Sequence, residues 1–327
     1  MQFFDPKSNI NFMGIRRVTV AVSLALVLIS IISLATRGLN LALDFTGGTL
    51  VEVLYEEPIE QPAVVAALEA AEVSGAVVQR FSSKNFSIRL SPESVEKLAD
   101  ESEVSLDESS LDGRNAAVGL EVIKALSVGG NKVTIKRSEF VGPQVGKELA
   151  YNGIVAVFVV LTGIMIYIAI RFEWKFAVSV VAGELHDVII TLGFFSLLGL
   201  DFDLTVLAAI LAVDGYSVND KIVVFDRVRE LFRSTRKTSP EEVLNMSINQ
   251  TLARTIMTSL TTLLTVVALY VFGGPALQGF SLALIVGITV GTLSSIFFAS
   301  PVLLSLGVTK QDLMPKAKDE EALARRP

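Results

Sequence analysis

The sequence predicts a polytopic α-helical membrane protein with six transmembrane helices and one small α+β domain outside the membrane. Of its 327 residues, 51% are hydrophobic and only 19% are charged, below the roughly 25% charged residues of ordinary soluble domains. The apolar residues come in blocks near the ~20 residues that a helix needs to cross a bilayer. One long, more polar stretch follows the first block. These features indicate a membrane protein rather than a soluble protein with a large core.

The expected spans are six apolar runs. The first, residues 18–36, is longer than the roughly 7–15 apolar residues of a signal peptide, so we expect it to remain as an uncleaved span. The other five lie within residues 148–305. Their apolar cores cover 151–170, 176–198, 204–225, 255–272 and 281–305.

Lys and Arg in the short loops predict the orientation. They fall on one side of the expected membrane, whereas the opposite loops, 199–203 and 273–279, contain neither. Because positively charged loops stay in the cytoplasm, we expect the N-terminal residues 1–17 and the tail 306–327 to be cytoplasmic. Residues 37–147 then lie outside.

Residues 37–147 read as a small α+β domain. Strand-like alternation and helical patterns follow one another in the order β-α-β-β-α-β, which is typical of a ferredoxin-like fold. The expected elements are a strand at 49–55, a helix at 61–71, a hairpin with strands at 76–81 and 85–90, a connection at 91–110, a helix at 113–126 and a closing strand at 132–140. The acids of this domain are scattered, so we expect no hydrolytic or metal site there.

Composition excludes several classes of function. The absence of cysteine removes disulfides, thiolate catalysis and thiolate metal sites. A single histidine, His186, leaves no histidine cluster for a metal, and no nucleophile–base set is found. The net charge of −6 gives no reason to expect nucleic-acid binding. We therefore expect no enzyme activity, no metal and no cofactor.

Ionisable side chains inside the predicted spans are the candidate functional residues, because charges in hydrocarbon are costly and are usually functional. They are Glu184, His186 and Asp187 in 176–198, Asp214, Asp220 and Lys221 beside Asn219 in 204–225, and Arg254 at the start of 255–272. One interpretation is a proton relay, in which carboxylates gain and lose protons while Arg254 favours the ionised form. The other is that the charges pair permanently and fix the helix register.

Three further patterns bear on this choice. Thr258, Thr261 and Thr265 continue from Arg254 as one polar stripe, which we expect to face the bundle interior opposite the acids. Lys221 lies seven residues after Asp214, so extended side chains of the two could meet. In the last span, Gly287, Gly291 and Ser295 form a small-residue ladder typical of close helix packing.

Six segments stand out in order along the chain: LDFTGGT at 43–49, EFVGPQVG at 139–146, RFEW at 171–174, HDVIIT at 186–191, GYSVND at 215–220 and FGGP at 272–275. Together, and in this order, they resemble the SecF family of the bacterial SecD–SecF protein-export complex. The resemblance runs from about residue 10 to residue 310. Its signature residues include Asp44, Gly47, Gly48, Gly142 and Pro143; the glycine pair permits a tight turn at the membrane border.

The resemblance implies an RND-type half with a periplasmic domain, in the bacterial inner membrane. Its expected partners are SecD, which would complete twelve spans, the SecYEG translocon, the auxiliary subunit YajC, an unfolded preprotein and protons. It implies that the proton-motive force drives late preprotein translocation and release. By position, Asp220 of the Asn219–Asp220 pair matches the family's motor aspartate, Arg254 its arginine, and Asp187 the acid of its His–Asp pair.

The chain departs from the family pattern at two membrane positions. Asp214 stands where SecF-like sequences are usually apolar, and Lys221 where they usually carry a small hydroxylated residue. Depth in the membrane favours Asp214 as the proton site, whereas the family match favours Asp220. We choose Asp220, since an Asp214 paired with Lys221 would not titrate freely. The alternatives are an RND-type exporter half for small molecules or lipids, and a passive translocon scaffold.

Overall fold

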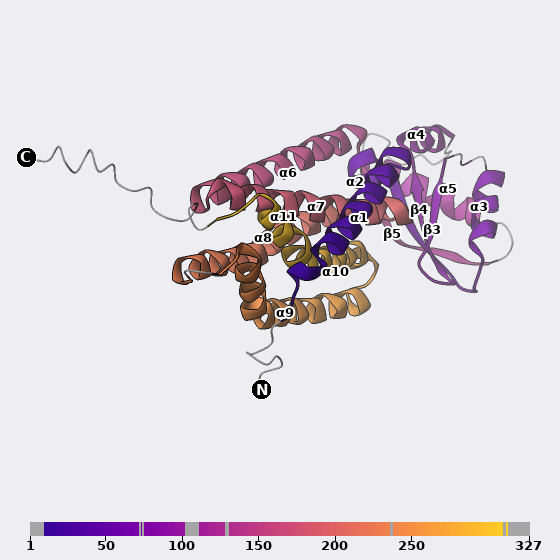
Figure 1. The fold of residues 1–327 in the computed structure, drawn as a ribbon. Helices are drawn as coiled ribbons and strands as arrows, with labels where there is room; N and C mark the ends of the chain where they lie inside the picture. The colour runs from indigo at the N-terminus through magenta and orange to yellow at the C-terminus, as the bar shows by residue number, and fades with distance from the viewer. Residues whose placement is uncertain are drawn as a thin grey trace, which may run out of the picture. The chain divides into compact units, whose positions relative to one another are not determined.

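The computed structural model describes residues 10–71, 73, 75–101, 111–127, 131–235, 238–309 and 312. The chain divides into two compact units. One, the helical unit, comprises Met1–Asn40 and Ala156–Pro327; the other, the α+β unit, is Leu41–Val155. Figure 1 labels the helices and strands of both units.

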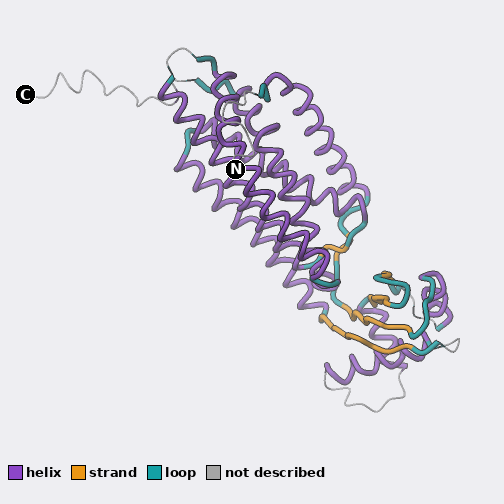
Figure 2. Tube along the Cα trace, turned by 90° about the horizontal axis from the view of Figure 1, so that it is seen from below, coloured by secondary structure: helices purple, strands orange, loops and turns teal. Residues whose placement is uncertain are grey.

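The helical unit is built from long helices that run alongside one another (Figure 2). Its elements are the 3₁₀ turn η1 (Met13–Ile15), α1 (Arg16–Thr36), the end of α6 (Pro143–Arg171), α7 (Trp174–Leu198), α8 (Leu204–Ser234), α9 (Pro240–Phe272), α10 (Pro275–Ser294), the π-helical turn η2 (Ser295–Ala299) and α11 (Ser300–Ser305). Two short strands, β1 (Asn40–Leu41) and β6 (Asp201–Phe202), pair with each other. Helix α8 packs against α7, α9 and α10, and α7 also packs against α1. Helix α8 is therefore central to the unit.

Local sequence signals set the helix ends. Asp203 caps α8, because its Oδ1 accepts a hydrogen bond from the Val206 amide at 2.7 Å. At the start of α9, Ser239 and Glu242 form a reciprocal capping box around Pro240. Gly199 ends α7 in the left-handed conformation with φ of 63°, which glycine adopts without a steric penalty. These signals place the turns between the predicted spans.

Five helical segments of the described chain are long and apolar enough to cross a membrane, by length and composition. They are Met13–Thr36, Pro143–Arg171, Trp174–Leu198, Pro240–Phe272 and Pro275–Ser305. The chain is therefore a polytopic helical membrane protein, as predicted. The run 204–225 is also helical, within α8, but α8 carries several charges and is not among the five. Its membrane crossing stays a prediction.

The α+β unit holds a four-stranded antiparallel sheet in the order β3-β4-β2-β5. Its elements are α2 (Leu43–Thr46), β2 (Gly48–Tyr55), α3 (Gln61–Ala70), β3 (Val77–Arg80), β4 (Asn85–Leu90), α4 (Pro92–Glu101), α5 (Leu111–Leu126) and β5 (Val133–Val141). In register, Thr49 pairs with Leu90 and with Phe140. The predicted strands and both predicted helices are present within a few residues of their expected bounds.

One face of this sheet forms the core of the unit. The alternating residues Val51, Val53 and Tyr55 of β2 are buried, as are Phe86 and Ile88 of β4. Strand side chains alternate between faces, so these residues point to the same side and meet buried residues of α3 and α5. The expected connection 91–110 begins instead with helix α4, and its remaining residues 102–110 lie outside the described part. Ser91 favours this helix start, since its Oγ accepts from the Ser94 amide at 3.2 Å.

Candidate functional site

A cluster of charged and hydroxyl side chains is buried among helices of the helical unit. Helix α7 contributes Glu184, His186 and Asp187, and α8 contributes Asp214, Ser217, Asp220 and Lys221. Ser294 of α10, Ser295 of η2 and Thr255 of α9 complete it. Every one of these side chains belongs to a residue that is at most 6% exposed. The structure thus brings together most of the ionisable residues that the sequence singled out.

Glycines make room for this cluster. A Cβ at Gly183 would lie 2.4 Å from Lys221 Cε, and one at Gly291 would lie 2.7 Å from Ser217 Oγ. Such distances are too short for real side chains, so the stem of Lys221 passes directly over the backbone of α7. The expected role of Gly291 in close packing is consistent with this contact.

Lys221 is fully buried and bound to two acids of α7. Its Nζ lies 2.7 Å from Glu184 Oε1 and 2.7 Å from Asp187 Oδ2, and it also donates to Ser217 Oγ. The contact with Asp214 that the sequence allowed for an extended Lys221 is not formed. The acids of α7 lie directly across from the ammonium group, whereas Asp214 is two turns away along the same helix.

Asp187 is surrounded by hydrogen-bond donors. Besides Lys221, its Oδ2 accepts from Ser217 Oγ at 2.6 Å and from Ser294 Oγ at 2.8 Å. Its Oδ1 lies 2.8 Å from His186 Nδ1. The His186 ring stacks on Phe298 with centroids 4.3 Å apart, and its Nε2 has no partner among the described residues. These contacts assign the hydrogen to Nδ1 and hold Asp187 as a carboxylate.

Asp220 has a different environment, made of hydroxyl groups. Its Oδ1 accepts from Thr255 Oγ1 at 2.7 Å, and its Oδ2 accepts from Ser295 Oγ at 2.8 Å. Ser295 lies in the π-helical turn η2, a distortion that is frequent at functional sites. Arg254 is exposed on α9, one residue before Thr255, and forms no ion pair with a described residue.

Asp214 stands out by its lack of partners. The residue is 2% exposed, yet neither carboxylate oxygen has a hydrogen-bond donor among the described residues, and the same holds for Glu184 Oε2. Asn219, by contrast, is exposed on another face of α8 and takes no part in the cluster.

The threonine stripe does not face the bundle interior, so that expectation is wrong. Thr258, Thr261 and Thr265 are exposed, and each hydroxyl donates to a carbonyl one turn earlier in α9. Thr255 and Ser259 of the same helix are the buried residues. The sequence patterns did not assign Thr255, Ser217 or Ser294 to the cluster, and they indicated Ser295 only as a packing position. The available signals were that Ser217 lies one turn before Lys221 and that Thr255 lies beside Arg254.

The signature glycines lie together in the α+β unit. Gly47 and Gly48 have φ of 71° and 118°, which favours glycine. A Cβ at Gly48 would lie 2.1 Å from the Leu90 carbonyl oxygen, and one at Gly47 would lie 2.9 Å from Pro143 Cα. Asp44 is in the first turn of α2, and Gly142 directly precedes α6. The glycine pair thus lets β2 start between β4 and the first turn of α6.

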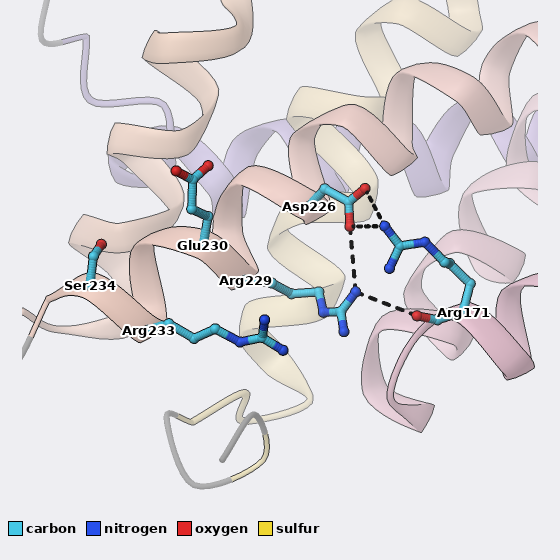
Figure 3. A pocket seen from close by; sticks show the side chains of 6 residues that line it. All are labelled: Arg171, Asp226, Arg229, Glu230, Arg233 and Ser234. Carbon is cyan, nitrogen blue, oxygen red and sulfur yellow. Dashed lines mark hydrogen bonds and ion pairs between the residues drawn. The ribbon is translucent and has the colours of Figure 1, made fainter. Parts of the chain in front are cut away.

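A second ionic group lies near the C-terminal end of α8 and lines a shallow pocket (Figure 3). Arg171 donates to both oxygens of Asp226 at 3.0 and 2.9 Å, and Arg229 reaches Asp226 Oδ1 at 3.4 Å. Unlike the buried cluster, this network of Arg171, Asp226 and Arg229 is solvent-accessible, with the Arg171 side chain 43% exposed. Among the described residues no group of His, Asp and Glu is placed to hold a metal ion.

Comparisons with known proteins agree on one family. Residues 121–309 match the family described as "Protein export membrane protein SecD/SecF, C-terminal", and residues 32–59 match the "SecD/SecF GG Motif". The chain is 47% identical to the protein translocase subunit SecF of Pseudomonas aeruginosa, over 95% of this chain and 96% of that one. It is 43% identical to SecF of Vibrio alginolyticus, over 98% and 97%.

Solved structures give the same result. The crystal structure of SecDF, a translocon-associated membrane protein from Thermus thermophilus, matches with a TM-score of 0.80 and 38% identity. The match covers 93% of this chain but only 39% of the SecDF chain. A SecDF structure in the super-membrane-facing form matches with a TM-score of 0.66 and 39% identity, over 94% of this chain and 39% of that one.

Proposed function

The chain belongs to the SecD/SecF family of protein-export membrane proteins, and we propose that it is a proton-driven subunit that acts with SecD in late preprotein translocation. The resemblance found in the sequence is thereby confirmed as a family membership. The proposal adds that the proton gradient is the energy source and that late translocation is the step it drives. Asp220 is the central residue of this proposal, together with Arg254.

The observation that carries the proposal is the environment of Asp220. Thr255 and Ser295 each donate one hydroxyl to it, and no Lys or Arg of the described residues forms an ion pair with it. A hydroxyl can rotate to donate or to accept, so the same two groups can stabilise both the ionised and the protonated carboxyl. Asp187 differs, since Lys221 is bound to it. Of the two acids in the family pattern, Asp220 is therefore the one able to gain and lose a proton without breaking an ion pair.

Asp220 also lies where protonation can change helix packing. Its carboxyl joins α8 to α9 through Thr255 and to η2 through Ser295. Loss or gain of charge alters the strength of both hydrogen bonds. Arg254, one residue before Thr255, favours the ionised form when it is near. Movement of α9 relative to α8 would then be coupled to proton uptake and release.

The exposed polar stripe of α9 supports SecD as the partner. Arg254, Thr258, Thr261 and Thr265 are exposed in this chain, and a stripe ending in an arginine is costly against lipid. A second half with its own helices would cover it, as expected if SecD completes a twelve-span assembly. The 39% share of the SecDF chain that this chain covers agrees with one half of such an assembly.

The finer topology is part of the proposal. Helix α8, the fourth span in chain order, would bring the five to six, with its charges covered by α7, α9 and α10 rather than facing lipid. Both termini would be cytoplasmic and Leu41–Val155 periplasmic, in the bacterial inner membrane. The sheet order β3-β4-β2-β5, with helices α3 and α5 between strands, supports the ferredoxin-like assignment. SecYEG, YajC and the emerging preprotein would be the further partners.

The test is export of a secreted preprotein into inverted membrane vesicles under an imposed proton gradient. Asp220→Asn is compared with the unaltered chain and with Asp226→Asn, an exposed aspartate of the same helix. We expect the gradient-dependent part of export to disappear only in Asp220→Asn, while assembly with SecD is kept. Unchanged gradient-dependent export in Asp220→Asn with intact assembly would exclude the proton role and favour a passive scaffold.

A further inference from the structure

Arginines line the shallow pocket at the C-terminal end of α8, and one of them has no counter-charge among the described residues. Arg233 is exposed and forms neither a hydrogen bond nor an ion pair with any part of the chain that the structure describes. Arg229 lies four residues earlier, on the same helix face, where two like charges repel each other. Figure 3 shows both side chains extending to the same side of α8. This side of the pocket therefore carries an uncompensated positive charge.

The acids nearest to these arginines are already in use. Asp226 accepts two hydrogen bonds from one nitrogen of Arg171, at 3.0 and 2.9 Å. Arg229 is held more loosely, since it lies 3.4 Å from Asp226 Oδ1 and 3.4 Å from Glu173 Oε2. Neither acid is in contact with Arg233, so neither of them neutralises it.

The charges around the pocket do not balance. Glu230 pairs with Arg227, and its carboxylate points away from Arg233 (Figure 3). Among the described residues of this group, four arginines stand against three acids: Arg171, Arg227, Arg229 and Arg233 against Glu173, Asp226 and Glu230. One positive charge is left over. A ligand with a single negative charge, such as a phosphodiester, would balance it.

The free donors suit a phosphate group. Nη1 of Arg229 makes both of its hydrogen bonds, to Arg171 O and Asp226 Oδ1, so Nη2 has no partner among the described residues. Arg229 is also oriented before any ligand binds, because its Cζ and that of Arg171 each lie 5.2 Å from the centroid of the Phe172 ring. A guanidinium group presents a planar fork of N–H donors that matches phosphate oxygens. Arg229 and Arg233 can therefore bind one phosphate between them.

The sequence around the pocket favours a lipid as the source of the phosphate. Helix α6 ends at Arg171, directly after the exposed apolar residue Ile170. Helix α7 begins at Trp174, which is also exposed, and exposed tryptophans are typical of the membrane–water interface. The pocket thus lies at the level of lipid headgroups, with an apolar helix surface beside it for acyl chains. Its assignment to the cytoplasmic leaflet rests on the topology proposed above.

We propose that this pocket binds the phosphate of an anionic phospholipid in the cytoplasmic leaflet, with Arg229 and Arg233 as its ligands. Basic pockets between membrane helices are suited to such headgroups. The headgroup should carry one net negative charge, as phosphatidylglycerol does. A zwitterionic headgroup brings its own cation to a site that already has one cation too many, so it should bind less well.

Native mass spectrometry of the complex with SecD tests this by counting the phospholipids that stay bound. The complex is purified from vesicles of equal amounts of phosphatidylglycerol and phosphatidylcholine, which share the phosphate and differ in net charge. We expect Arg233→Gln to retain one phosphatidylglycerol fewer than the unaltered complex, with no change in phosphatidylcholine. Because Arg233 has no partner among the described residues, the substitution should not disturb folding, and the same spectra show whether SecD stays bound.

Arg16→Gln is the matched control. Arg16 lies on the same expected side of the membrane but is already paired with Glu241 at 2.9 Å, so we expect its loss to leave the lipid count unchanged. Inorganic phosphate, added before the measurement, distinguishes the two sources of a phosphate group, and we expect it not to displace the lipid because it has no acyl chains.

Four results would overturn the proposal. They are phosphatidylglycerol retained in full by Arg233→Gln, an equal loss of phosphatidylcholine in that variant, the same loss in Arg16→Gln, and release of the lipid by inorganic phosphate. The count involves no proton gradient, no export and no particular orientation of the chain in the membrane. Failure here is therefore distinct from failure of the proposed function.

Discussion

The buried cluster around Lys221 and the exposed network around Asp226 use the same kinds of group in opposite surroundings. Lys221 Nζ lies 2.7 Å from its two carboxylates, and Arg171 lies 2.9 Å from Asp226. The side chains of Lys221, Glu184 and Asp187 are at most 3% exposed, whereas those of Arg171 and Asp226 are 43% and 39% exposed. The cluster and the network therefore differ in their exposure to solvent and not in their contact distances.

The difference teaches what each region can contribute. Water and salt screen the exposed network, so its pairs are worth about 0–1 kcal/mol each. The buried cluster exists only while its charges are balanced, since an unmatched buried charge costs several kcal/mol. The buried cluster therefore adds little net stability, but its stability depends strongly on the charge of each of its members. We therefore expect a proton gained or lost in the buried cluster to change helix packing, and one gained at Asp226 to leave the packing unchanged.

The largest expected effect is that of Lys221→Met. Removal of the ammonium leaves Asp187 and Glu184 without their shared cation, and we expect the free energy of unfolding to fall by about 3–5 kcal/mol. Thermal unfolding of the purified protein in detergent measures this. Adding Glu184→Gln and Asp187→Asn should restore most of the loss. If Lys221→Met alone lowered the free energy of unfolding by only about 0–1 kcal/mol, as expected for a surface pair, the contrast between the buried cluster and the exposed network would be contradicted.

Gly183→Ala should disturb the same cluster through its shape. The new Cβ would lie 2.4 Å from Lys221 Cε, so the lysine must move, and we expect a loss of about 1–3 kcal/mol in unfolding free energy. The matched control is Gly215→Ala in α8, where nothing lies within 4 Å of the added atom. There alanine should be neutral or stabilise the helix by up to about 1 kcal/mol. If Gly183→Ala and Gly215→Ala destabilised the protein equally, the close contact between Lys221 and the backbone at Gly183 would not be the cause of the loss.

The exposed network should respond weakly. A double-mutant cycle of Arg171→Ala and Asp226→Ala should give a coupling of less than about 1 kcal/mol. The coupling should decrease further at high ionic strength, because the Debye length falls from about 10 Å at 0.1 M to about 3 Å at 1 M salt. The same unfolding assay at two salt concentrations measures it. A salt-independent coupling of several kcal/mol would remove the contrast with the buried cluster.

The smallest effect is expected at Asp312. Burial raises the pKa of this carboxyl, but hydrogen bonds from Lys175 and Thr309 outweigh it and leave the pKa below its ordinary value of 3.8. A group whose pKa is lower in the folded state stabilises above its unfolded pKa, and this contribution is lost as pH falls through the folded pKa. Asp312→Asn should therefore cost less than about 1 kcal/mol at neutral pH and nothing at strongly acidic pH. Unfolding measured from strongly acidic to neutral pH tests this. A loss of unfolding free energy in Asp312→Asn that does not change with pH would argue against the ion pair between Lys175 and Asp312.

The sequence was sufficient for the apolar runs, the acids within them and the family, because these depend on local composition and on motifs. It did not determine which way each helix faces. The stripe Thr258, Thr261 and Thr265 was assigned to the interior, yet these hydroxyls bond to their own helix and are exposed. In a membrane helix, hydropathy differs little around the axis, so periodicity gives a weak indication of rotation.

The partner of Lys221 was missed for a related reason. Spacing along α8 brought Asp214 within reach of an extended lysine, but the ammonium group binds Glu184 and Asp187 on α7. That choice depends on Gly183, which lets α7 approach α8 closely. Contacts between helices follow from such local packing, which spacing within one helix cannot predict. The hydroxyl donors to Asp220 come from two further helical elements and were missed for the same reason.

The central claim is that protons pass through Asp220, and proton flux tests it most directly. Liposomes containing this chain with SecD are given a pH gradient, and an internal pH-sensitive dye reports proton entry. We predict flux above that of empty liposomes for the unaltered chain and for Asp226→Asn, and none above that level for Asp220→Asn. Equal flux through Asp220→Asn and the unaltered chain would contradict the account.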